Sequence, residues 1–171
     1  MPKRQRSVLG KGELHLITST CFLHQEKLGL EKHRDLLCQL LEQLRAKFNF
    51  KIVGYVILPA SFQVLMSEPD TETVEELIQT LRQRYQRRYN TSARSDETAW
   101  EKQIGDRHII GADQIVSCLH AMHQAPVKAG LAMASTDWEW SSALRYAGLP
   151  EGVVTVDPAS DPRARIELGK L

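Results

Sequence analysis

The chain has 171 residues and a mass of 19.4 kDa, the size of one compact domain with at most a short appendage. Its 22 lysines and arginines face 21 aspartates and glutamates, so the formal net charge is only +1. This balance argues against a protein that holds duplex nucleic acid by bulk positive charge. The hydrophobic fraction of 42% and the charged fraction of 25% exclude a wholly disordered or fibrous chain.

The sequence predicts a cytoplasmic protein with no membrane anchor. No apolar run approaches the ~20 residues that a bilayer-spanning helix needs. The basic N-terminus, residues 1–12, is not followed by the apolar core of a signal peptide. Cys21, Cys38 and Cys118 are few, odd in number and widely separated, which is typical of reduced thiols.

The first half of the chain predicts a strand, a helix and a hairpin. Alternating β-branched residues predict a strand over 13–22, and leucines at helical spacing predict an amphipathic helix over 31–48. The nearly continuous apolar run 51–58 is typical of a strand buried on both faces. Pro-Ala at 59–60 breaks that strand, and the alternation over 61–67 predicts its hairpin partner.

A second helix and a short strand are predicted next. Asp70 or Thr71 is expected to cap the helix, because glutamates crowd the first turn that follows. The helix is expected to end near Asn90. A short strand over 107–110 is a weaker prediction from the same kind of pattern.

A third helix is predicted over 112–124 and is expected to stop before Pro126. The preceding elements read βαββαβ, which predicts an α/β (α+β) fold of the ferredoxin-like kind. Such a fold has one antiparallel sheet with helices on one face, to which this chain adds a C-terminal helix. We expect a flexible basic segment over 1–12, the domain over 13–148 and an irregular tail over 149–171.

Two segments in the last third carry a family resemblance. Residues 120–131 read His-Ala-Met-His-Gln-Ala-Pro-Val-Lys-Ala-Gly-Leu, and residues 137–142 read Asp-Trp-Glu-Trp-Ser-Ser, with Tyr146 after them. They resemble the REP-associated tyrosine transposases, a domesticated branch of the insertion-sequence-200-like single-tyrosine HUH family. In that branch the two segments read Tyr-x-x-x-Asn-Pro-Val-(Lys/Arg)-x-Gly and Asp-(Trp/Tyr)-x-(Trp/Phe)-Ser-(Ser/Thr).

Two upstream segments support the resemblance by order and spacing. Residues 58–65, Leu-Pro-Ala-Ser-Phe-Gln-Val-Leu, stand where the family reads Met-Pro-Asn-His-x-His-x-Leu. Residues 100–103, Trp-Glu-Lys-Gln, stand at the family's Trp-Gln-x-x position. The resemblance therefore extends from about residue 13 to about residue 146.

The resemblance implies a catalytic site whose chemistry this chain lacks. In the family, two histidines on a strand bind a divalent cation such as Mg²⁺ or Mn²⁺, and a tyrosine on a helix attacks phosphorus. A polar residue one helical turn later completes the metal shell. The histidine positions fall on Ser61 and Gln63, the tyrosine on Ala121 and the asparagine on Ala125. We therefore expect no bound metal cofactor and no strand cleavage by the family mechanism.

Histidines and a cysteine offer a weaker alternative site. Cys118, His120 and His123 lie close together on one helix and could begin a zinc site, although packing is the preferred interpretation. His15 and His108 are isolated in the sequence, so we expect them to be surface or packing residues.

Basic and aromatic residues are the remaining candidates for nucleic-acid contact, because arginine and tyrosine suit phosphates and exposed bases in single strands and hairpins. The candidates are Arg82, Arg84, Arg87, Arg88, Arg94, Tyr85, Tyr89, Lys3, Arg4, Arg6 and Lys128. The alternatives are that basic residues at the end of a helix complement its dipole, that the two tyrosines pack, and that the N-terminal cations form a solvated tail.

The sequence also suggests a role for two tryptophans and a function for the whole chain. Trp138 and Trp140 are expected to fix the C-terminal segment onto the sheet, with base stacking as the lesser alternative. The leading hypothesis is a catalytically inactive transposase-like protein that binds single-stranded or hairpin DNA. The alternatives are a protein-interaction or structural module, with a homodimer conceivable, and an active nuclease that uses Tyr85 or Tyr89.

Overall fold

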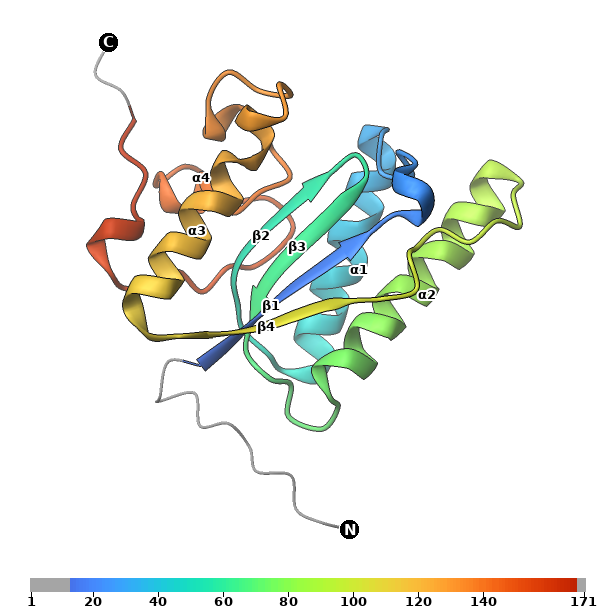
Figure 1. Cartoon of the computed structure of the whole chain (residues 1–171), viewed down its shortest axis with the longest axis horizontal. Helices are drawn as coiled ribbons and strands as arrows, with labels where there is room; N and C mark the ends of the chain where they lie inside the picture. Colours follow the sequence, from blue (N-terminus) through green and yellow to red (C-terminus); the bar gives the residue numbers. More distant parts are fainter. Residues whose placement is uncertain (1–12, 169–171) are drawn as a thin grey trace.

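The fold is a single four-stranded antiparallel sheet with helices on both faces. The computed structural model describes residues 13–168. The strands follow the order β2-β3-β1-β4 (Figure 1). Their bounds are β1 Glu13–Thr20, β2 Ile52–Leu58, β3 Ser61–Met66 and β4 Gly105–Ile110. The mixed α/β class and the single antiparallel sheet predicted from the sequence are confirmed.

The helices separate into two groups on the two faces of the sheet. Helices α1 (Glu31–Phe48) and α2 (Val74–Ala93) lie together on one face, as a βαββαβ unit requires. Helix α3 (Gly111–Lys128) and the short α4 (Ala143–Tyr146) lie across the other face (Figure 1). The predicted additional C-terminal helix is therefore α3, which covers the second face of the sheet.

Two apolar layers hold the helices to the sheet. Between the sheet and α1 and α2, large side chains are almost completely buried, among them Leu44, Phe62 and Tyr85. On the other face, Leu119 of α3 approaches Gly54 of β2 so closely that a Cβ added at Gly54 would lie 2.5 Å from the leucine Cδ2. The missing side chain at position 54 therefore sets how closely α3 can approach the sheet.

Helix α2 begins later than the sequence predicted. Its N-cap is Thr73, whose hydroxyl accepts a hydrogen bond from the Glu76 amide, while the Glu76 carboxylate accepts one from the Thr73 amide. This capping box satisfies two amides at once. Asp70 instead accepts a hydrogen bond from the side chain of Asn49 at 2.9 Å. The predicted cap at Asp70 or Thr71 is therefore wrong by two or three residues.

Helix α3 continues through Pro126, whereas the sequence predicted that it would stop before this residue. A proline inside a helix removes one amide donor. Pro126 is buried, and the helix ends two residues later at Lys128. The amides of Ala129 and Leu131 still donate to Ala125 and Pro126 carbonyls at 3.0 and 2.9 Å. Burial of the ring and the continued backbone bonding compensate for a single missing hydrogen bond.

The chain after α3 covers an edge of the sheet. Ser141 forms an isolated antiparallel bridge with Val56, and the Ile57 amide donates to the Trp140 carbonyl at 2.8 Å. The segment 138–142 therefore lies along β2. Farther on, Val154 and Val156 are buried and belong to the main core. None of the described helices is both long and apolar enough to span a bilayer.

Candidate functional site

The two histidine positions of the family motif lie on β3 and face α3. Gln63 pairs with Val56 on one side and with Thr18 on the other, and its side-chain amide donates to the Thr18 hydroxyl at 3.2 Å. Ser61 occupies the same face two residues earlier and is half-buried. An amide and a hydroxyl are poor ligands for a divalent cation, and here the amide is already bonded to a neighbouring strand.

The tyrosine position lies on α3, beside a cavity between α3 and β4. Ala121 is exposed on α3, and Ala125 is half-buried one turn later. Ala121 borders a cavity of about 650 Å³ together with Arg107 of β4 and Cys118 of α3. The face that would carry the nucleophile in the family therefore presents an opening with a cation beside it.

The cavity is lined by the cation Arg107 and by the thiol of Cys118, which does not neutralise that charge. Burial raises the pKa of the Cys118 thiol, and the nearby Arg107 guanidinium opposes this increase only in part. A buried neutral thiol is a weak nucleophile and a weak metal ligand. Asp113, the carboxylate on the cavity wall, is paired with Arg163 at 2.7 Å. Arg107 can therefore accept an anionic group from outside.

Buried hydrogen bonds connect α3 to the segment that follows it and to β2. His123 of α3 contacts the Ser142 hydroxyl at 2.7 Å, and Ser142 in turn bonds both the amide and the carbonyl of Tyr55 on β2. Burial lowers the pKa of His123 to about 4, and the neighbouring His120 contributes in the same direction. His123 is therefore neutral near pH 7 and connects α3 to the edge of the sheet.

The two tryptophans anchor the segment that covers β2, as predicted. Trp138 donates its indole N–H to the Ile57 carbonyl, and Trp140 donates to Asp35, both at 2.8 Å. The guanidinium of Arg34 lies 4.8 Å and 4.0 Å from the centres of the two rings. Both rings are buried in these contacts, which confirms packing and leaves no face of either ring free for base stacking.

The arginine and tyrosine cluster of α2 lies on the other side of the sheet. Within it, Arg82 is buried and donates to the Glu101 carbonyl, while Tyr85 is fully buried and donates to the Lys27 carbonyl at 2.6 Å. Tyr89 stacks on Tyr85 with ring centres 5.9 Å apart. Arg82 and Tyr85 are therefore internal structural residues and are not available to a ligand.

The other sequence-predicted cations do not converge on one place. Arg87, Arg88 and Arg94 are exposed toward the end of α2, and Arg84 is half-buried there. Lys128 is exposed at the end of α3, on the opposite face of the sheet. The predicted contacts at Lys3, Arg4 and Arg6 lie outside the described residues.

None of the buried tyrosines can replace the missing nucleophile. Burial raises the pKa of Tyr55, Tyr85 and Tyr146, to about 12 in the last case. Tyr85 and Tyr89 lie with α2 on the face of β3 that carries Phe62, whereas Gln63 points to the other face. The structure therefore does not bring Tyr85 or Tyr89 to the Ser61 and Gln63 positions.

The substitution Tyr85→Phe separates the structural role of Tyr85 from a role in binding. The change removes the hydrogen bond to the Lys27 carbonyl and keeps the buried ring, so we expect unfolding to become easier by about 1–2 kcal/mol. Affinity for hairpin DNA is expected to stay the same. Chemical denaturation and fluorescence anisotropy measure the two effects; a loss of DNA affinity in a folded variant would contradict the structural assignment.

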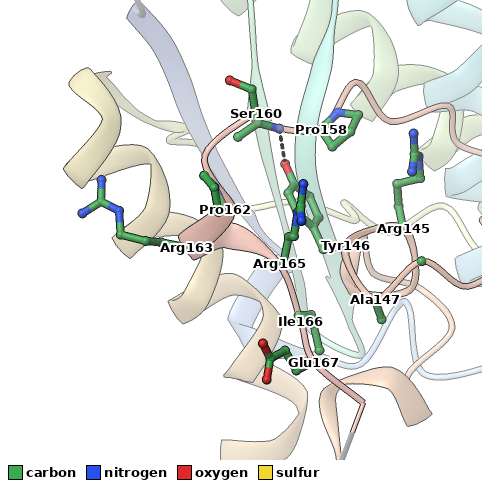
Figure 2. Close-up of a pocket in the computed structure, with 12 residues that line it drawn as sticks. Arg145, Tyr146, Ala147, Pro158, Ser160, Pro162, Arg163, Arg165, Ile166 and Glu167 are labelled. Carbon is green, nitrogen blue, oxygen red and sulfur yellow. Dashed lines mark hydrogen bonds between the residues drawn. The ribbon is translucent and has the colours of Figure 1, made fainter.

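A larger cavity lies elsewhere, between α4 and the C-terminal segment. It has a volume of about 880 Å³ and is bordered by Arg145, Tyr146 and Arg165 (Figure 2). The Tyr146 hydroxyl donates to the Val53 carbonyl at 2.7 Å and accepts from the Ala159 amide at 2.8 Å, the bond dashed in Figure 2. Both bonding directions of this hydroxyl are in use, so Tyr146 fastens the tail and is not a free nucleophile.

The structure bears on both groups of histidines that the sequence singled out. His15 and His108 are not isolated, because they are direct partners across β1 and β4 with ring centres 4.4 Å apart. The alternative zinc set is not assembled, because His120 contacts the Arg163 carbonyl while His123 contacts Ser142. His15 and His108 meet because of the register between β1 and β4, two strands that are far apart in the sequence. The sequence alone does not give this register.

The fold is that of the REP-associated tyrosine transposases. The solved structure of such a transposase bound to a REP hairpin aligns with 99% of this chain and 100% of its own, with a TM-score of 0.65 and 16% identity. A candidate transposase from Deinococcus radiodurans aligns over 69% of this chain and 92% of its own, with a TM-score of 0.48 and 14% identity. No protein-family model and no curated protein matches the sequence. The resemblance seen in the motifs is thus confirmed for the fold.

Proposed function

We propose that this chain binds structured single-stranded DNA, such as the hairpins of palindromic repeats, without cleaving it. The observation that carries the proposal is the opening beside Ala121, where the tyrosine position holds an alanine and Arg107 of β4 is exposed. The solved REP-associated transposase with the same fold was bound to a REP hairpin, which supports hairpin DNA as the ligand class.

Arg107 is suited to a backbone phosphate. Its planar guanidinium can donate two parallel hydrogen bonds to a phosphate. Cys118 beside it is neutral, and Asp113 is held by Arg163. A net charge of only +1 then fits a protein that meets DNA at a defined place and with modest affinity.

The four changed positions support binding without cleavage. Ala121 has no nucleophilic atom, and Ala125 cannot complete a metal shell. Gln63 donates its side-chain amide to Thr18, and Ser61 offers only a hydroxyl. No residue at these positions can activate a phosphodiester by the phosphotyrosine route.

The binding test compares two exposed arginines on opposite faces of the sheet. For the labelled hairpin we expect Arg107→Ala to weaken binding by about tenfold and to reduce the salt slope by about one counterion. Arg87→Ala, on α2, is the matched control and is expected to leave affinity within about twofold. Fluorescence anisotropy at several salt concentrations measures both. If only Arg87→Ala weakened binding, the DNA interface would lie on α2 and not beside Arg107. If the unmodified chain did not bind the hairpin at low salt, a protein-interaction module would be the better interpretation.

The cleavage test uses the same hairpin. Incubation with Mg²⁺ or Mn²⁺ is expected to yield no nicked strand and no covalent protein–DNA adduct on a denaturing gel. An adduct would show that a side chain outside the four changed positions serves as the nucleophile, and it would contradict the inactive assignment while leaving DNA binding intact.

A further inference from the structure

Four ionisable side chains gather on the face of the sheet that also carries α2, and one of them, His108, borders the cavity beside Ala121 as well. His15 is buried, and its Nδ1 lies 2.9 Å from an Asp106 carboxylate oxygen while its Nε2 lies 3.1 Å from a Glu68 oxygen. His108 stands edge-on to His15. One ligand atom from each of His15, Asp106 and His108 lies within 4.8 Å of the others.

The strand register brings this group together. His15 and His108 are direct cross-strand partners on β1 and β4, so their side chains leave the same face of the sheet. Asp106 is two residues before His108 and shares that face. Glu68 follows the end of β3, where Met66 is the partner of His15 on its other side. Three neighbouring strands thus converge on one imidazole.

Both ring nitrogens of His15 face carboxylate oxygens. An imidazole binds a metal ion through one nitrogen while the other nitrogen donates its hydrogen to a carboxylate. With Nε2 of His15 bonded to Glu68, Nδ1 and the nearby Asp106 oxygen can share one metal ion.

We infer that His15, Asp106 and His108 bind a divalent transition-metal ion, with Glu68 holding the His15 ring. The metal occupies the Nδ1 side of His15, next to Asp106, and the Nε2 hydrogen stays on the bond to Glu68. A carboxylate behind a metal-bound histidine fixes the ring and its tautomer.

The donor set selects the class of metal. Two imidazoles and one carboxylate suit Zn²⁺, Cu²⁺, Ni²⁺ and Fe²⁺ better than Mg²⁺ or Ca²⁺, which prefer oxygen ligands. Asp106 and His108 are exposed on β4 and can rotate inward to the ~2.0–2.2 Å that zinc requires. The three cysteines are buried free thiols and none belongs to this group, so the site has no thiolate ligand.

Zinc titration of the whole chain, first freed of metal with a chelator, tests the site. We expect one Zn²⁺ per chain by calorimetry. The Co²⁺ form is expected to show ligand-field bands without a thiolate charge-transfer band. Zinc is also expected to raise the melting temperature.

Two variants make the result specific. His108→Asn changes an exposed side chain and keeps the fold testable, and it is expected to weaken zinc binding at least tenfold. His24→Asn is the matched control, because His24 is exposed at a positive φ of 54° that asparagine tolerates, and it is expected to bind zinc normally. Absence of saturable binding, equal affinity in His108→Asn, or equal weakening in His24→Asn would each overturn the assignment, whatever the outcome of the DNA experiments.

Discussion

Trp138→Ala is expected to lower the free energy of unfolding by about 3–5 kcal/mol. The substitution empties a buried ring site beside Trp140 and Arg34 and leaves the buried Ile57 carbonyl without the indole N–H that it accepts at 2.8 Å. Both losses act on the segment that covers β2. Chemical denaturation monitored by circular dichroism measures the change.

A conservative variant separates the two contributions at this position. Trp138→Phe keeps a smaller aromatic ring in the site and removes the donor, so we expect a smaller loss of about 1–2 kcal/mol. The order of the two variants is the critical result. If Trp138→Ala were as stable as the original chain, the segment 138–142 would not be a structural part of the domain.

Acidification is expected to destabilise the protein through His123. Burial lowers the pKa of His123 in the folded chain from 6.5 to about 4, so the unfolded chain binds the extra proton first as the pH falls. The stability from this residue is complete above pH 6.5 and is lost as the pH falls toward 4. The loss by pH 4.5 is about 2.5 kcal/mol. Denaturation curves at successive pH values give the slope.

The His123→Gln variant isolates this effect from other titrating groups. Glutamine keeps a polar atom near Ser142 and does not titrate, so the variant is expected to be less stable at pH 7 but flatter between pH 7 and 4.5. The difference between the two curves belongs to His123. Parallel curves would mean that the histidine is already free to protonate in the folded protein.

The local patterns in the sequence predicted the elements well where burial follows a simple period. The helix over Glu31–Phe48 was predicted with its observed bounds, because its leucines alternate with charged residues at helical spacing. The opposite placements of Phe62 and Gln63 follow from the period of two along β3. Thr73 was not predicted as the N-cap of α2, because the polar residues 70–73 include three that can each cap a helix.

Arg82 shows a signal that was available but not used. It lies four residues after Ile78 and three before Tyr85, so helical spacing alone places it on the buried stripe of α2. Its charge suggested a surface role, yet its guanidinium bonds the Glu101 carbonyl and lies 5.7 Å from the centre of the Trp100 ring. Position on the helix, more than residue type, decided where this side chain lies.

The histidine group could not be predicted from local patterns. His15 and Asp106 are 91 residues apart, and their contact depends on the exact register between β1 and β4. A shift of one residue would turn His108 to the other face of the sheet and replace it with Arg107 or Ile109. Long-range register is the information that a single sequence lacks.

The covering of β2 by segment 138–142 also determines how the sheet can meet another copy of itself. With that edge closed, β4 is the open edge of the described sheet, and it carries Asp106, Arg107 and His108 in succession. Charged side chains on an edge strand discourage unwanted strand addition from a second chain. Asp106 and His108, proposed here as metal ligands, and Arg107, proposed to contact a phosphate, thus also disfavour edge-to-edge aggregation. A homodimer is therefore expected to form through a surface other than β4, unless the charges on this strand are first neutralised.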